Sequence, residues 1–243
     1  MLDQAFEAVT NIDGRLLRSL LWLLTRPGQL TLAFLQGRRK LFLAPVPLFL
    51  VTNVLFFTVD SMSGGMVFST PLESHLRTQP WSDAMRPLIT RRLEAMHTTA
   101  AAYAPQFDAE IGLHARSLIM LQAVSFTVLL AAVCRGSRRP FAAHAVFSLH
   151  LYAFTLLILS AGTLVPAAPR LWGGIRSQSD GLDHVLSVTL VGACAVYLWV
   201  AVGAVYGERG ASLVVKCALL TAGATAIFLG YRFVLLLITL YTT

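Results

Sequence analysis

Five long apolar runs, separated by basic or polar segments, restrict what this chain can fold into. They cover residues 41–59, 117–133, 142–166, 184–206 and 212–241. A helix needs about 20 apolar residues to cross the hydrocarbon layer of a bilayer, and these runs are close to that length or longer. Hydrophobic residues make up 56% of the chain and charged residues only 13%, which is more apolar than a soluble domain of this size can bury. We therefore predict an all-α, polytopic membrane protein with about five transmembrane helices.

The distribution of charge predicts how the five spans are oriented. With the N-terminus in the cytoplasm, the internal segments carry eleven basic and four acidic residues, and the external segments carry seven basic and eight acidic residues. Basic residues concentrate on the cytoplasmic side of membrane proteins. We expect a multi-pass protein of a bacterial cytoplasmic membrane, with its N-terminus inside and its C-terminus outside. The excess of basic charge then reflects topology and contact with anionic lipid, and no nucleic-acid partner is expected.

Residues 1–40 form a separate cytoplasmic segment in this prediction, ahead of a transmembrane domain over 41–243. The segment has helical periodicity, with Asp13 suited to cap one short helix, Pro27 to begin a second and Gly37 to end it. Leucines and aromatic residues lie on one side and arginines on the other. This pattern is typical of helices that lie in the membrane surface, and equally of helices packed on the protein's own cytoplasmic face.

Nine basic residues are expected to contact the anionic cytoplasmic leaflet, because they flank the ends of the predicted spans on that side. They are Arg15, Arg18, Arg26, Arg38, Arg39, Lys40, Arg135, Arg138 and Arg139.

The largest polar region, residues 60–116, lies outside the membrane in this topology. Two helix-forming stretches, from about Trp81 to Tyr103 with Pro87 near its start and from about Gln106 onward, predict a small helical hairpin. The last apolar run is longer than one span needs. Either it is one tilted helix whose Arg232 extends toward the outer interface, which we favour, or the helix ends at Gly230.

Three stretches resemble a bacterial membrane family, the uncharacterised domain of unknown function 3667. The first carries Arg26, Pro27, Gly28, Gly37, Arg39, Pro45 or Pro47, and Asn53. The second, HAVFSLHLYAF, is similar to the family's His-x-x-Phe-x-x-His signature and places it on His144, Phe147, His150 and Phe154. The third ends the fourth span with Tyr206 and Gly207. The likeness extends over roughly 15–241 and implies a membrane topology and a shared histidine motif, but no biochemical activity. Many members carry a zinc ribbon that these residues lack, so no role tied to that ribbon is expected.

The two histidines of the third span are candidate functional residues, because ionisable side chains are costly in lipid. His144 is expected near the cytoplasmic interface. His150 and Asn53 are each expected near the centre of the bilayer, so we predict that His150 faces the bundle interior and hydrogen-bonds a polar residue such as Asn53. Three interpretations are open: a neutral imidazole that pairs helices, part of a proton or ion path, or a ligand or haem contact.

Three carboxylate–imidazole pairs on the outer side form a second, weaker candidate. Their three- or four-residue spacings place both groups on one helical face, if the segments are helical, and the converged pairs would make a metal or pH-responsive site. We expect solvated, unrelated pairs instead. The pairs are Glu94 and His97, Glu110 and His114, and Asp180 and His184.

The sequence favours a non-enzymatic accessory or scaffold protein that acts through helix–helix contacts, with a membrane protein or a second copy as partner. No phosphate-binding loop, dinucleotide turn, nucleophile elbow or zinc-protease motif is present, and no cofactor or catalytic residue is expected. The alternative is a small transporter or channel whose polar path includes His150, Asn53 and Arg232. A transporter predicts that polar groups converge on one water-filled cavity, whereas a scaffold predicts a dry bundle with an exposed apolar face.

Overall fold

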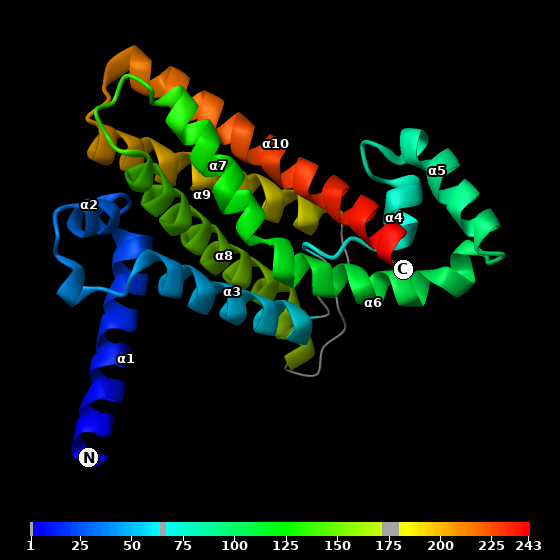
Figure 1. Ribbon diagram of the computed structural model, residues 1–243, viewed down its shortest axis with the longest axis horizontal. Coiled ribbons are helices and arrows are strands. Elements are labelled where there is room, and N and C mark those ends of the chain that lie inside the picture. Colours follow the sequence, from blue (N-terminus) through cyan, green and yellow to red (C-terminus); the bar gives the residue numbers. More distant parts are fainter. Residues whose placement is uncertain (1, 64–66, 172–179) are drawn as a thin grey trace.

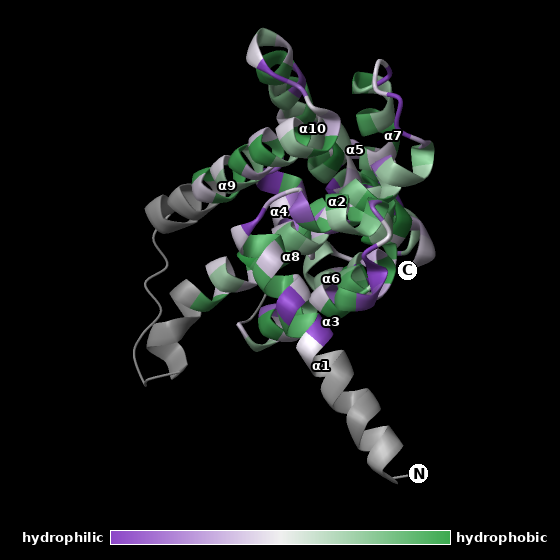
Figure 2. Cartoon of the chain, turned by 90° about the vertical axis from the view of Figure 1, so that its left-hand side faces the viewer, coloured by the Kyte–Doolittle hydropathy of each residue, from purple (hydrophilic) through white to green (hydrophobic). Residues whose placement is uncertain are grey.

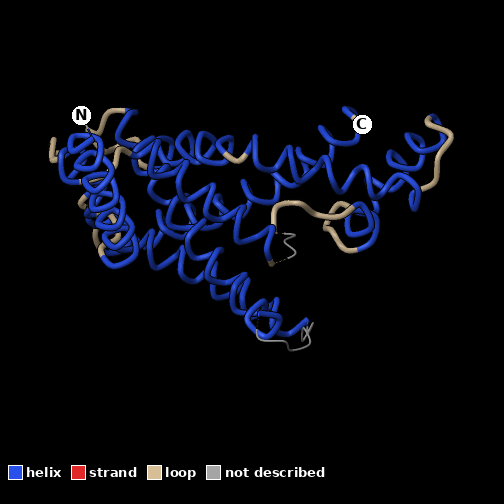
Figure 3. Tube along the Cα trace, turned by 90° about the horizontal axis from the view of Figure 1, so that it is seen from below, coloured by secondary structure: helices blue, strands red, loops and turns tan. Residues whose placement is uncertain are grey.

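The computed structural model describes residues 2–63, 67–171 and 180–243, and the side chains of 14–63, 67–164 and 188–243 among them. Every regular element in these ranges is helical (Figure 3). The all-α prediction is confirmed, and several of the helices are long and apolar enough to span a membrane. Among the described residues, four single helices meet this criterion of length and composition. A bent pair of helices gives a fifth candidate span if the pair counts as one crossing.

The five spans differ in detail from the apolar runs. They consist of α3 (Pro45–Met62), the bent pair α6 (Ala100–Leu118) and α7 (Met120–Val133), α8 (Phe141–Leu171), α9 (Asp180–Tyr206) and α10 (Gly210–Thr242). The run 117–133 is short for a span, and α6 supplies the missing length across a bend of 46°. The first span begins its α-helix at Pro45, because a proline suits the first turn and residues 39–41 form a separate 3₁₀ turn.

The long helices run side by side and their connections gather at two ends of the molecule (Figures 1 and 3). One, which we call the α2 end, contains α1 (Leu2–Thr25), α2 (Gln29–Leu35), the α7–α8 loop and the α9–α10 turn. The other, the α5 end, contains α4 (Leu72–Arg77), α5 (Ser82–Ala95) and the first part of α6. Helix α8 lies between α3, α7 and α9 and therefore forms the centre of the bundle.

The N-terminal segment departs from the prediction at Asp13. Helix α1 continues through Asp13 instead of starting there, and it runs across the direction of the bundle (Figure 1). Helix α2 follows after a sharp turn at residues 26–28 and ends at Leu35, with Gly37 in the left-handed conformation just beyond it. The predicted helix end at Gly37 is therefore correct to within two residues.

Helix α10 is continuous through Gly230, so the single-helix interpretation of the last run is confirmed. The helical hairpin predicted within residues 60–116 forms with shifted boundaries, because residues 96–99 break it and α6 begins before Tyr103. The short helix α4 was not predicted.

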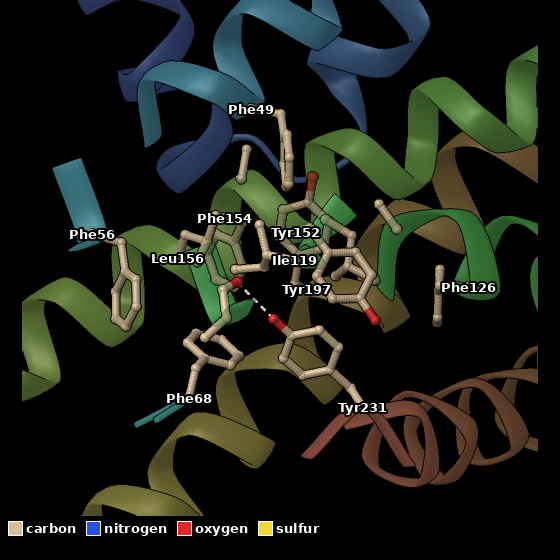
Figure 4. Close-up of a cluster of buried hydrophobic side chains, with 14 of the residues drawn as sticks. Phe49, Phe56, Phe68, Ile119, Phe126, Tyr152, Phe154, Leu156, Tyr197 and Tyr231 are labelled. Carbon is tan, nitrogen blue, oxygen red and sulfur yellow. Dashed lines mark hydrogen bonds between the residues drawn. The ribbon is translucent and has the colours of Figure 1, made fainter. Parts of the chain in front are cut away.

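An aromatic cluster joins α10 to the rest of the bundle (Figure 4). Phe68 packs edge-on against Phe56 of α3 and Tyr231 of α10, with ring centroids 5.3 and 6.0 Å apart. The Tyr231 hydroxyl donates a 2.7 Å hydrogen bond to the carbonyl of Ala115 near the bend between α6 and α7. The exposed sides of α9 and α10 are strongly apolar (Figure 2).

Candidate functional site

His150 of α8 lies inside the bundle, with 1% of its surface exposed. Its Nδ1 is 2.8 Å from Oγ1 of Thr31, which is also fully buried. Thr31 belongs to α2, so the short helix of the N-terminal segment reaches the imidazole of the third span. The prediction that Asn53 is the partner is wrong. Asn53 lies partly exposed on α3, and the hydrogen bond of His150 goes to Thr31. No sequence pattern marks Thr31 as the partner, because 119 residues separate it from His150.

The turn before α2 explains how this contact is possible. Gly28 has a φ of 79°, and a Cβ added there would lie 2.8 Å from the Cα of Ala201 in α9. Only glycine tolerates both this conformation and this approach. The hydroxyl of buried Tyr197 also contacts the backbone of Gly28. Gly28 therefore lets α2 pack directly on α9 and places Thr31 against His150.

The second ring nitrogen of His150 has no partner among the described residues. Nε2 is buried, and no hydrogen bond reaches it from the described side chains. A neutral imidazole has one donor and one acceptor nitrogen, so the Thr31 contact satisfies only one of them. Leaving the other unsatisfied in a dry bundle costs about 1–3 kcal/mol. His150 can therefore pair two helices as observed and still accept one additional hydrogen-bonding group.

His144, six residues before His150 on the same helix, makes a separate contact. Its Nδ1 is 2.7 Å from the hydroxyl of Tyr206, and the two rings stack with centroids 5.5 Å apart and an interplanar angle of 7°. Tyr206 is the last residue of α9. His144 is buried and joins α8 to α9 at the α2 end, so it is not a side chain that extends from the bundle into the interface.

Arg232 belongs to α10, and its contact does not involve His150. Its Nε donates a 2.8 Å hydrogen bond to Oγ1 of Thr70, and its guanidinium lies over the ring of Phe228. Thr70 precedes α4, so this contact attaches the α5 end to α10. The predicted polar path through His150, Asn53 and Arg232 is thus divided among separate contacts.

A further histidine, His75 of α4, was missed by the sequence analysis. It is completely buried, accepts a 3.2 Å hydrogen bond at Nδ1 from the Trp81 indole, and stacks on that ring. Burial, together with the positive charge of Arg232, lowers the pKa of His75 to about 4. Its Nε2 has no partner among the described residues. A single histidine in a polar loop carries no pattern that marks it in advance.

The two carboxylate–imidazole pairs whose side chains are described, Glu94 with His97 and Glu110 with His114, do not form a common metal site. His97 lies beyond the end of α5 with a φ of 51°, so it does not share a helical face with Glu94. Glu110 and His114 are both in α6, and His114 Nδ1 is 3.0 Å from Oγ1 of Thr239. The side chains of Asp180 and His184 lie outside those described. No group of three His, Cys, Asp or Glu side chains able to hold a metal is found in the described part of the chain.

The nine basic residues predicted to contact lipid fall into two groups. Four contact the protein through a backbone carbonyl or an aromatic ring, namely Arg15, Arg26, Arg39 and Arg139. Arg26, Arg39 and Arg139 are nevertheless exposed, and so are the other five, namely Arg18, Arg38, Lys40, Arg135 and Arg138. All nine lie at the α2 end.

A family model matches the N-terminal part of the chain. No curated protein and no solved structure matches the chain. The histidine motif of α8 lies outside the part that a family model matches. Residues 13–57 match the family described as "Protein of unknown function (DUF3667)", and this segment contains the Gly28 turn, Thr31 and most of α3.

Proposed function

We propose that the chain is a non-enzymatic scaffold of a bacterial cytoplasmic membrane and acts by packing one helix face against a partner helix. One observation carries the proposal. Small residues recur every four positions along α10 and all of them are exposed: Ala218, Ala222, Ala226 and Gly230. Only 17% of the apolar span of α10 is buried within the chain.

The exposed small residues of α10 matter because of how helices associate in lipid. Lipid tails solvate large apolar side chains as well as another helix does, so close backbone approach and van der Waals packing drive association. Small residues every four positions permit that approach. Where α10 packs within its own bundle, it presents larger side chains such as Leu213, Leu220 and Leu235, and one small residue, Gly223, which lies against Leu129 of α7. A Cβ added at Gly230 would meet nothing within 4 Å, so the face is open.

The charge distribution supports an orientation with the α2 end in the cytoplasm. The nine basic residues predicted for the cytoplasmic side gather there, and eight of the twelve acidic residues fall in the segments predicted to lie outside. The N-terminus is then inside and the C-terminus outside.

The test measures the size of the complex that the full chain forms in its native membrane, by native electrophoresis and single-molecule counting. Replacing Ala222 and Ala226 by leucine is expected to weaken association by about tenfold or more, since it separates the backbones. Gly192→Leu, at an exposed glycine of α9 where an added Cβ meets nothing, is the control and should change little. A wild-type chain that runs as a single copy without partners, or equal loss in both variants, would contradict the proposal.

The transport alternative has one observation in its favour, the unpartnered Nε2 of buried His150. A flux assay on liposomes with a pH gradient separates it from the scaffold. The scaffold predicts no flux from the wild type. Flux that disappears in His150→Ala, with the variant still folded, would favour transport instead.

A further inference from the structure

A cleft at the α2 end lies between the α7–α8 loop and the last turn of α9. Residues 136–139 form one wall and residues 204–207 the other, around a cavity of about 520 Å³. It opens at the ends of α8 and α9, where a membrane protein of this topology meets the headgroup layer. The location differs from that of the α10 face and of the His150–Thr31 contact.

The lining of this cleft is cationic and lacks acid. Arg138 and Arg139 contribute their guanidinium groups, and no carboxylate is among the described residues that line it. Arg139 donates a 3.0 Å hydrogen bond to the carbonyl of Val205, which holds it across the cleft and leaves its other N–H groups free to bind. The nearby carboxylate of Glu208 is engaged with Ser212 and Lys216, so it does not neutralise these arginines.

Two other groups of the cleft favour an anion. The hydroxyl of Ser137, a residue that lines the cleft, has no hydrogen-bond partner among the described residues; it is buried beside the cleft, so it becomes a donor for an anion once its side chain rotates toward the opening. Helix α8, 31 residues long, begins at Phe141 immediately after the two arginines and directs the positive end of its dipole toward this loop. The cleft therefore combines two guanidinium groups, one unpaired hydroxyl and a helix N-terminus.

We propose that this cleft binds a phosphate group. Guanidinium groups match phosphate oxygens through paired charge-assisted hydrogen bonds, and the cavity has room for a phosphate with its substituents. Exposed Phe141 lies next to the arginines and provides an apolar neighbour for an acyl chain. The phosphate belongs either to an anionic phospholipid headgroup or to a soluble phosphate compound, and the two sources share the same contacts.

The experiment uses the full chain in vesicles of zwitterionic lipid with and without phosphatidylglycerol. Native mass spectrometry counts the phosphatidylglycerol that remains bound after release, and inorganic phosphate is added as a soluble competitor. Arg138→Gln with Arg139→Gln is expected to lower retention by about tenfold, and Ser137→Ala by a few-fold. Because Arg139 also contacts Val205, Arg138→Glu alone is a second variant that leaves this contact intact and should lower retention as well.

The matched control removes the same charge elsewhere at the α2 end. Arg38→Gln with Lys40→Gln changes two exposed cations outside the cleft and should leave retention within about twofold, because diffuse attraction is screened by salt. Retained lipid that resists inorganic phosphate identifies the headgroup as the ligand, and retained lipid that phosphate displaces identifies a soluble phosphate compound. Equal loss in the cleft and control variants, or full retention in Arg138→Glu, would overturn the proposal.

Discussion

The two ends of the bundle each hold a buried histidine, but the contacts around these histidines differ. At the α2 end, His150 bonds a neutral threonine from a helix that packs through a glycine directly on α9. At the α5 end, His75 stacks on an indole and lies near the charge of Arg232. Backbone fit therefore determines the first contact and electrostatics the second. The α2 end should be sensitive to changes in shape, and the α5 end to pH.

The largest effect is expected at Gly28, where shape matters most. Gly28→Ala places a Cβ 2.8 Å from the Cα of Ala201 and forces alanine into a left-handed φ. The strain and the clash together should destabilise the fold by about 3–5 kcal/mol. Gly37→Ala is the matched control, because Gly37 has a similar φ of 84° but nothing within 4 Å of an added Cβ. Thermal unfolding of both variants measures the difference; equal losses would mean that backbone strain alone is responsible.

The pH response of the α5 end ranks second. His75 has a pKa of about 4 in the fold against an ordinary value of 6.5, so the folded state disfavours its charged form. Stability is unaffected above pH 6.5 and falls as the pH drops from 6.5 to 4, by on the order of 3 kcal/mol in total. Trp81 fluorescence against pH follows the detachment of α4. His75→Phe should remove this dependence and His97→Phe should not. A wild-type signal that stays flat down to pH 4 would refute the electrostatic interpretation.

Thr31→Val tests the hydrogen bond that joins α2 to α8. The change keeps the side-chain shape but leaves both nitrogens of His150 unsatisfied, which should cost about 1–3 kcal/mol. Hydrogen exchange of the α2 amides reports the loosening directly. Thr52→Val is the control, because Thr52 is equally buried but bonds only the carbonyl of Phe49 in its own helix. If α2 exchanges no faster in Thr31→Val than in this control, the contact does not hold α2.

The smallest effect is expected at the α9–α10 turn. Hydrogen bonds from Lys216 and Ser212 lower the pKa of Glu208, so its contribution is present above the ordinary pKa and is lost as the pH falls through the lowered value. About a fifth of each side chain in the Glu208–Lys216 pair is exposed. Glu208→Gln should therefore cost no more than about 1 kcal/mol, and less in high salt. Unfolding in low and high salt checks this; a larger, salt-independent loss would indicate a structural role for the turn.

Periodicity and composition were sufficient to predict the long apolar helices, but not the short helix α4 and not the partners of the helices. The apolar run around His150 indicates a buried position, because a polar group in a span avoids lipid. Thr31 is distant in sequence and lies on a helix whose pattern equally fits the membrane surface, so only the tertiary structure identifies it. The spacing of Glu94 and His97 predicted a shared helical face. That prediction failed because His97 lies in a left-handed turn beyond the end of α5. Burial of His75 depends on how α4 packs against α5 and α6, which no local pattern records.

The length of α10 has a consequence for how the two ends communicate. Its 33 residues extend about 50 Å as one helix, against about 30 Å of hydrocarbon. The helix must tilt or project, and near its C-terminus it is bound to α6 through Thr239 and Thr243. A thinner bilayer favours a larger tilt. Because α10 is continuous, a change in bilayer thickness would move its two ends together and be transmitted to the helices of the α5 end as a change in angle.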